Sequence, residues 1–69
     1  MIKPGVYRHF KGKRYRVLFE AVNSETGERM VVYLALYGEG KVWVRPASMW
    51  EEQVEADGVM QPRFAFESD

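Results

Sequence analysis

The chain has 69 residues and no cysteine, and its ten basic and ten acidic side chains give a formal net charge of zero. The length fits one domain spanning residues 1–69. The lack of cysteine excludes a disulfide framework, a thiolate metal site and a cysteine nucleophile. A hydrophobic content of 46% argues against an intrinsically disordered chain.

No stretch of the sequence has the length or composition of a membrane span. The longest apolar run is Met30 to Tyr37, whereas a spanning helix needs about 20 apolar residues. The segment Met1 to Phe10 also lacks the apolar core of a signal peptide. We therefore expect a soluble, cytoplasmic protein with no membrane partner.

Charge is distributed unevenly along the chain. Basic side chains crowd residues 1–20 and acidic side chains crowd residues 50–69. In the simpler interpretation, the two ends attract each other across a small fold. The alternative is a basic patch for nucleic acid, whose candidate residues are Lys11, Lys13, Arg14 and Arg16.

Period-2 alternation predicts two strands in the first third of the chain. The first is Val6–Phe10, which ends at a turn around Gly12. The second is Arg14–Val22, where Leu18 is an apolar residue on the expected outer face. Its expected inward face carries Tyr15, Val17, Phe19 and Ala21.

A turn-forming loop, Asn23–Glu28, leads into the most apolar stretch, Met30–Pro46. Its first part, Met30–Leu36, predicts a strand that is apolar on both faces. A glycine-bounded turn follows, and Val42–Arg45 predicts the returning antiparallel strand. We expect this hairpin to be the centre of the core.

The segment Ser48–Val54 fits either a helix or a strand. Ser48 and Glu51 have the spacing of a capping box, while Trp50 and Val54 also fit an alternating strand. We expect a helical turn over residues 47–49 followed by a strand over residues 50–54. A single helix through residue 55 is the alternative, and residues 62–66 predict a final extended segment.

These short strands, separated by frequent turns, predict an all-β fold. Its expected form is a small five-stranded antiparallel SH3-like barrel with a one-turn helix before the last strand.

The chain resembles a small bacterial family catalogued as domain of unknown function 1653. The resemblance extends from Gly5 to Phe64, and Asn23 and Trp50 stand where the family often has His and Phe. It implies a small β-barrel in a bacterial cytoplasm and no assigned activity. The segments that carry it are Gly5–Lys13, Ser24–Thr26, Val32–Tyr33, Leu36–Gly38, Trp43–Pro46, Met49–Trp50 and Pro62–Phe64.

The sequence favours a non-enzymatic protein with no cofactor and no metal site. The single histidine, His9, suits proton transfer, and a hydrolase-like site that pairs it with Ser24 and Glu25 is a remote alternative. One histidine among scattered carboxylates has no metal-ligand spacing. A structural or surface role for His9 is the simpler interpretation.

Aromatic and arginine side chains form the most informative set. On neighbouring strands they share one face, where they could stack nucleobases and contact phosphate, hold a peptide, or simply complete the core. We expect a binding module for nucleic acid; the alternative is a protein-interaction module or weak homodimer, which the outward positions expected for Leu18, Val31 and Ala35 favour. The candidate ligand-binding residues are Tyr7, His9, Tyr33, Tyr37, Trp43, Arg45 and Arg63.

Overall fold

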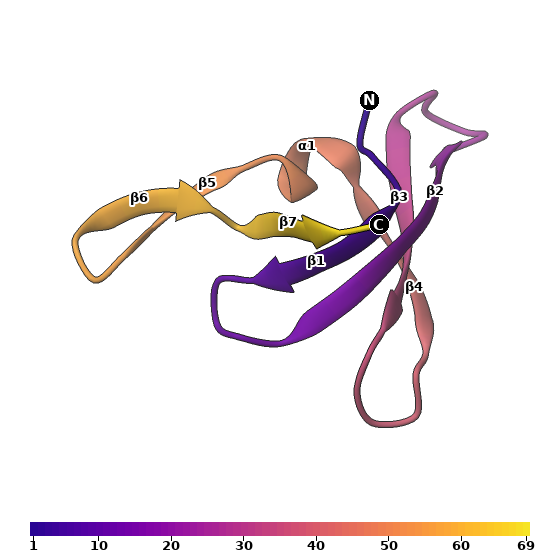
Figure 1. The fold of residues 1–69 in the computed structure, drawn as a ribbon. Helices are drawn as coiled ribbons and strands as arrows, with labels where there is room; N and C mark the ends of the chain where they lie inside the picture. The colour runs from indigo at the N-terminus through magenta and orange to yellow at the C-terminus, as the bar shows by residue number, and fades with distance from the viewer.

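The computed structural model describes residues 1–69, which form seven strands and one short helix (Figure 1). The all-β expectation is therefore confirmed, although with more strands than predicted. The elements are β1 Gly5–His9, β2 Arg14–Val22, β3 Arg29–Ala35, β4 Val42–Pro46, α1 Ala47–Trp50, β5 Gln53–Ala56, β6 Val59–Pro62 and β7 Phe64–Ser68.

Five strands form one antiparallel sheet in the order β4-β3-β2-β1-β7. Strands β4 and β7 are its two edges, so the sheet is not closed and the predicted SH3-like barrel is not confirmed in this detail. The remaining strands, β5 and β6, pair with each other in a separate hairpin. This hairpin projects away from the sheet (Figure 1) and separates α1 from the last strand.

The core lies on one face of the sheet, which we call the inner face. Tyr7, Val17, Val31 and Tyr33 are buried there. Trp50 of α1 packs against Tyr33, with ring centroids 4.9 Å apart, so the helix covers this face. The opposite face, the outer face, has no helix on it.

Strand β2 does not keep the alternation that the sequence predicts. Val17 pairs with Tyr33 on the inner face, but the register shifts after Val17 and Phe19 pairs with Val32. A bulge of this kind inserts one residue and moves the following side chains to the other face. The expectation that Phe19 and Ala21 point inward is therefore wrong, and Phe19 is exposed on the outer face.

The outward positions expected for Val31 and Ala35 are also wrong. Both side chains are buried on the inner face, and Val31 has no exposed surface. The alternating side chains of β3, Val32 and Leu34, face outward instead. Strand β3 is thus apolar on both faces, as predicted, with the two faces exchanged.

The helical turn is present and begins where expected, but Ser48 does not cap it. Helix α1 begins at Ala47, with Pro46 as its N-cap, and no side chain caps it. Ser48 therefore lies inside the helix, and the capping-box assignment is wrong. The strand that follows is Gln53–Ala56, three residues later than predicted, and the alternative of one helix through residue 55 is excluded.

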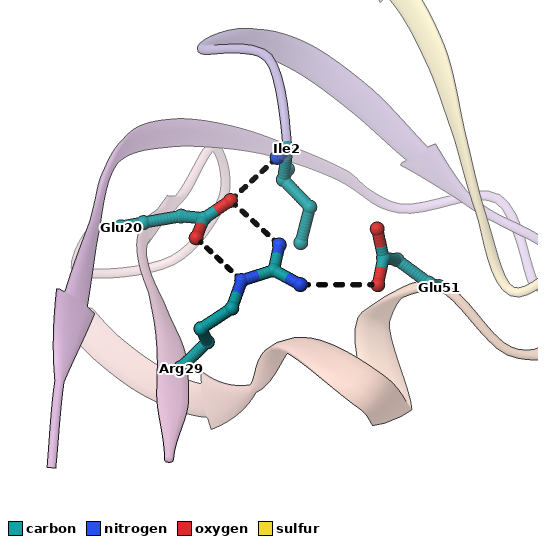
Figure 2. Close-up of polar contacts among 4 residues, drawn as sticks. All are labelled: Ile2, Glu20, Arg29 and Glu51. Atoms are coloured by element: carbon teal, nitrogen blue, oxygen red, sulfur yellow. Dashed lines mark hydrogen bonds and ion pairs between the residues drawn. The ribbon is translucent and has the colours of Figure 1, made fainter. Parts of the chain in front are cut away.

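One carboxylate ties the N-terminal segment to the hairpin of β2 and β3. Glu20 accepts two hydrogen bonds from the Arg29 guanidinium, each 3.0 Å, and one from the Ile2 backbone N–H (Figure 2). The Nη1 atom of Arg29 also lies 4.0 Å from Oε1 of Glu51, the residue that follows α1. The cluster anchors Ile2, whose side chain is part of the core.

No helix in this structure has the length and apolar character needed to cross a membrane.

Candidate functional site

The inner face is covered near α1 but uncovered toward the turn between β3 and β4. There a hollow of about 250 Å³ is lined by Tyr37, Trp43 and Ala35, together with residues 38–41 of the turn. Tyr37 is 39% exposed and Trp43 is 51% exposed. The hollow thus exposes two aromatic rings, and we call it the aromatic slot.

Tyr37 is held in place by a second tyrosine. Its hydroxyl is 2.8 Å from the Tyr15 hydroxyl, and the two rings meet edge to face. Burial, followed by this hydrogen bond, raises the pKa of Tyr15 to about 12. Tyr15 therefore stays a neutral phenol near pH 7. Its ring also packs edge to face against Tyr33 in the core, with ring centroids 5.5 Å apart.

A guanidinium lies beside the slot on the same face. Arg45 is two residues beyond Trp43 on β4, and its Cζ lies 5.3 Å from the centroid of the Phe64 ring. Trp50 stacks on Phe64 with a centroid separation of 3.7 Å and parallel planes. Arg45 has no carboxylate within ion-pair distance, and its Nε is 3.5 Å from the Tyr33 hydroxyl.

His9 reaches the same Phe64 ring from β1, with ring centroids 5.0 Å apart. Its Nδ1 accepts a hydrogen bond of 3.2 Å from the Lys11 N–H, so the proton of the neutral imidazole sits on Nε2. Burial, and then the charges of Arg45, Arg63 and Lys11, lower the pKa of His9. The imidazole is therefore a neutral donor in a positively charged region near pH 7.

The predicted basic patch is divided between the two faces. The Nζ of Lys13 lies 4.3 Å from the centroid of the Tyr37 ring, beside the slot. Lys41 lines the slot and lies 4.0 Å from Glu39. Arg14 and Arg16 instead belong to the outer face, where Arg14 forms an ion pair of 2.6 Å with Glu67.

Three of the predicted ligand-binding residues are engaged inside the protein. Tyr7 is buried and its hydroxyl donates to the Lys3 carbonyl at 2.7 Å. Tyr33 is buried beneath the slot. Arg63 donates to Glu52 at 2.7 Å. The exposed members of the set are Tyr37 and Trp43, and Arg45 and His9 are partly exposed.

The structure does not bring His9 and Ser24 together. His9 precedes the turn into β2, whereas Ser24 follows the far end of that strand. The loop of Ser24 is organised by Asn23, whose Oδ1 accepts hydrogen bonds from the N–H groups of Glu25 and Thr26. This is turn chemistry, and it supplies no partner for the histidine.

Four residues of the site were not predicted from the sequence: Tyr15, Ala35, Lys41 and Phe64. Tyr15 and Ala35 were assigned to strands, but a strand pattern does not reveal which end of a face remains uncovered. Phe64 pairs with His9 only because β7 returns beside β1. The pairing of the first and last strands is a long-range contact for which the local pattern carries no signal.

Comparisons with known proteins agree on one family. A family model described as a protein of unknown function (DUF1653) matches residues 5–66. The crystal structure of a protein belonging to DUF1653 from Bordetella bronchiseptica is 40% identical, with a TM-score of 0.90 over 97% of this chain and 88% of that chain. No curated protein matches the sequence. The open-sheet fold is therefore shared with a solved structure.

Proposed function

Because this chain belongs to the DUF1653 family, whose description assigns no activity, we propose a function from the inner face itself: a non-enzymatic module that binds single-stranded nucleic acid. The observation that carries the proposal is the aromatic slot with Lys13 and Arg45 beside it, two cations that form no ion pair; the third cation, Lys41, lies near Glu39. Exposed rings stack on bases of any sequence, and nearby cations attract the phosphate backbone.

Charge favours a nucleic acid over a neutral peptide as the ligand. Lys13 and Arg45 border the rings of the face and neither forms an ion pair. A proline-rich peptide would use the rings alone and would leave these charges without a role. A ligand that carries both flat rings and negative charges can contact the exposed rings and these two cations together.

The spacing along β4 suits one nucleotide unit. Trp43 and Arg45 are two residues apart on the same face, a rise of about 6.6 Å in an extended strand. A base in the slot would therefore place an adjacent phosphate near Arg45 and the Nε2–H of His9. A bound phosphate near His9 favours the protonated imidazole, because opposite charges attract.

The test is a titration of the ¹⁵N-labelled protein with a short single-stranded oligonucleotide at low salt. We expect amide shifts at Tyr37, Trp43 and Arg45 that weaken as salt rises. We also expect the pKa of His9, measured on its imidazole protons, to rise when the oligonucleotide is bound. A stack on Trp43 is worth about 1–3 kcal/mol, so Trp43→Ala should weaken binding at least about fivefold.

Matched variants distinguish binding at the inner face from non-specific attraction between opposite charges. Lys13→Gln and Arg16→Gln each remove one exposed cation, but Lys13 borders the slot and Arg16 lies on the outer face. The first should weaken binding and the second should not. Equal effects of the two variants, or no shifts with DNA or RNA at any salt, would overturn the proposal; shifts with a proline-rich peptide instead would assign the face to peptides.

A further inference from the structure

The outer face of the sheet carries a continuous apolar patch. Phe19 pairs with Val32, and Val32 pairs with Val44 across the next ladder. Leu34 and Val42 form the neighbouring pair. Phe19, Val42 and Val44 are each more than half exposed. These five side chains, with Leu36 at the end of β3, make up what we call the outer patch.

No part of the chain covers the outer patch. Helix α1 packs on the inner face through Trp50, and the hairpin of β5 and β6 projects away from the sheet (Figure 1). Phe19, Val42 and Val44 are 55–61% exposed and Leu36 is 43% exposed, so the patch leaves about 400 Å² uncovered, which is in the range of the largest apolar patch on a typical monomer. Such a largest patch is often functional.

The shape of the patch fits a second sheet. It is built from branched aliphatic side chains and one ring on three adjacent strands, without a charged side chain among them. Two such sheets pack face to face when their strands lie within about 30° of each other. A second copy of this chain offers the same surface, and a net charge of zero means that two copies do not repel each other.

Charges around the patch select one arrangement of two copies. Arg8 and Arg16 lie on the outer face near the start of β2. Glu25 and Glu28 lie in the loop after its other end. All four are exposed and none forms an ion pair within the chain. A two-fold axis that lies between the two packed sheets and runs perpendicular to their strands brings the basic end of one copy over the acidic end of the other.

We propose that the outer patch is a self-association surface through which two copies of this chain pack sheet against sheet with their strands antiparallel. A patch of about 400 Å² with its charged border is smaller than the roughly 800 Å² per partner of a standard interface. The dimer is therefore weak and reversible. It leaves the inner face of each copy open, so it does not depend on the proposed function.

The test is sedimentation equilibrium from about 10 μM to about 1 mM, a range that covers weak association. The wild type should pass from monomer toward dimer across this range. Val44→Asp places a charge in the patch and should raise the dissociation constant at least about tenfold. The matched control is Val59→Asp on β6, because Val44 and Val59 are 61% and 59% exposed.

A charge exchange tests the antiparallel arrangement. Arg16→Glu should weaken association, and adding Glu28→Arg to it should restore most of the loss. Urea unfolding of each variant checks that the monomer stays folded, and oligonucleotide shifts should be unchanged in Val44→Asp. A wild type that remains monomeric at about 1 mM, equal effects of Val44→Asp and Val59→Asp, or no rescue by the second charge would overturn the proposal.

Discussion

Glu20 shows how much one side chain can connect in a fold of this size. Its carboxylate accepts hydrogen bonds from Arg29 on β3 and from the backbone of Ile2 (Figure 2). These contacts, led by the Arg29 hydrogen bond, lower the pKa of Glu20 to about 2. In the unfolded chain the same carboxyl has its ordinary, higher pKa.

This difference predicts how stability depends on pH. Because the pKa is lower in the folded state, Glu20 stabilises the protein above the ordinary pKa of a glutamate, and this stabilisation is lost as the pH falls toward about 2. Glu20→Gln should lower the melting temperature at pH 7 and flatten the acid part of the stability profile. Thermal unfolding followed by circular dichroism at several pH values measures both effects.

The control for Glu20 is Glu55→Gln on β5. Glu55 is exposed and forms no ion pair, so its replacement should leave the profile close to that of the wild type. If Glu20→Gln kept the wild-type acid profile, the cluster of Figure 2 would not be a source of stability.

The pairing of β1 with β7 depends on a residue that has no side chain. Gly5 has φ of +143°, and a Cβ there would lie 2.5 Å from the Ser68 carbonyl oxygen and 2.8 Å from a ring carbon of Phe66. Gly5→Ala should therefore push β7 away from β1. With backbone strain of about 1–2 kcal/mol and overpacking of about 1–3 kcal/mol, the loss in unfolding free energy should be about 3 kcal/mol.

Gly12→Ala is the matched control for this element. Gly12 also has a positive φ, +110°, but a Cβ there would have nothing within 4 Å beyond its own chain neighbours. The variant should lose about 1 kcal/mol from strain alone. Urea unfolding compares the two variants, and equal losses would show that backbone strain, and not the contact with β7, sets the importance of Gly5.

The elements also show where alternation predicts structure and where it fails. The pairs of β3 and β4 follow strict alternation, because a hairpin is fixed by its own turn and by local register. The bulge in β2 breaks alternation after Val17. The apolar Leu18 on an expected outer position was the one irregularity in the sequence at this point, and alternation alone does not identify it as a bulge.

The same reasoning explains the candidate site. Shared parity placed Tyr33, Trp43 and Arg45 on one face, and the pairs Tyr33–Trp43 and Val31–Arg45 agree with this. Parity does not say how far a covering helix reaches. The burial of Tyr33 and the exposure of Trp43 follow from the position of Trp50, which is a tertiary contact.

At the scale of the whole molecule, an open sheet with a small core leaves little margin of stability. A domain of this length has roughly 3–10 kcal/mol of unfolding free energy, at about 0.05–0.15 kcal/mol per residue. The core contains eight buried residues, and four of them, Tyr7, Tyr33, Trp50 and Phe64, are aromatic. Each core ring therefore contributes a large share of the unfolding free energy.

Phe64 is the ring on which this margin can be tested. It is 5% exposed, stacks on Trp50 of α1 and meets His9 of β1, so it joins the helix to both strands at one edge of the sheet. Phe64→Ala should lose about 3–5 kcal/mol, which is enough to unfold a large fraction of the molecules at room temperature.

Phe66 lies two residues further on the same strand and gives the comparison. It is 41% exposed, so Phe66→Ala should lose much less and remain folded. Urea unfolding and the near-ultraviolet circular dichroism of the stacked rings measure the two variants together. Equal stability of the two would mean that the core does not depend on the Trp50–Phe64 stack, and that the inner face is held by the sheet alone. A larger loss at Phe64 would mean that the Trp50–Phe64 stack, which also contacts Arg45, is a main source of the stability of the whole fold.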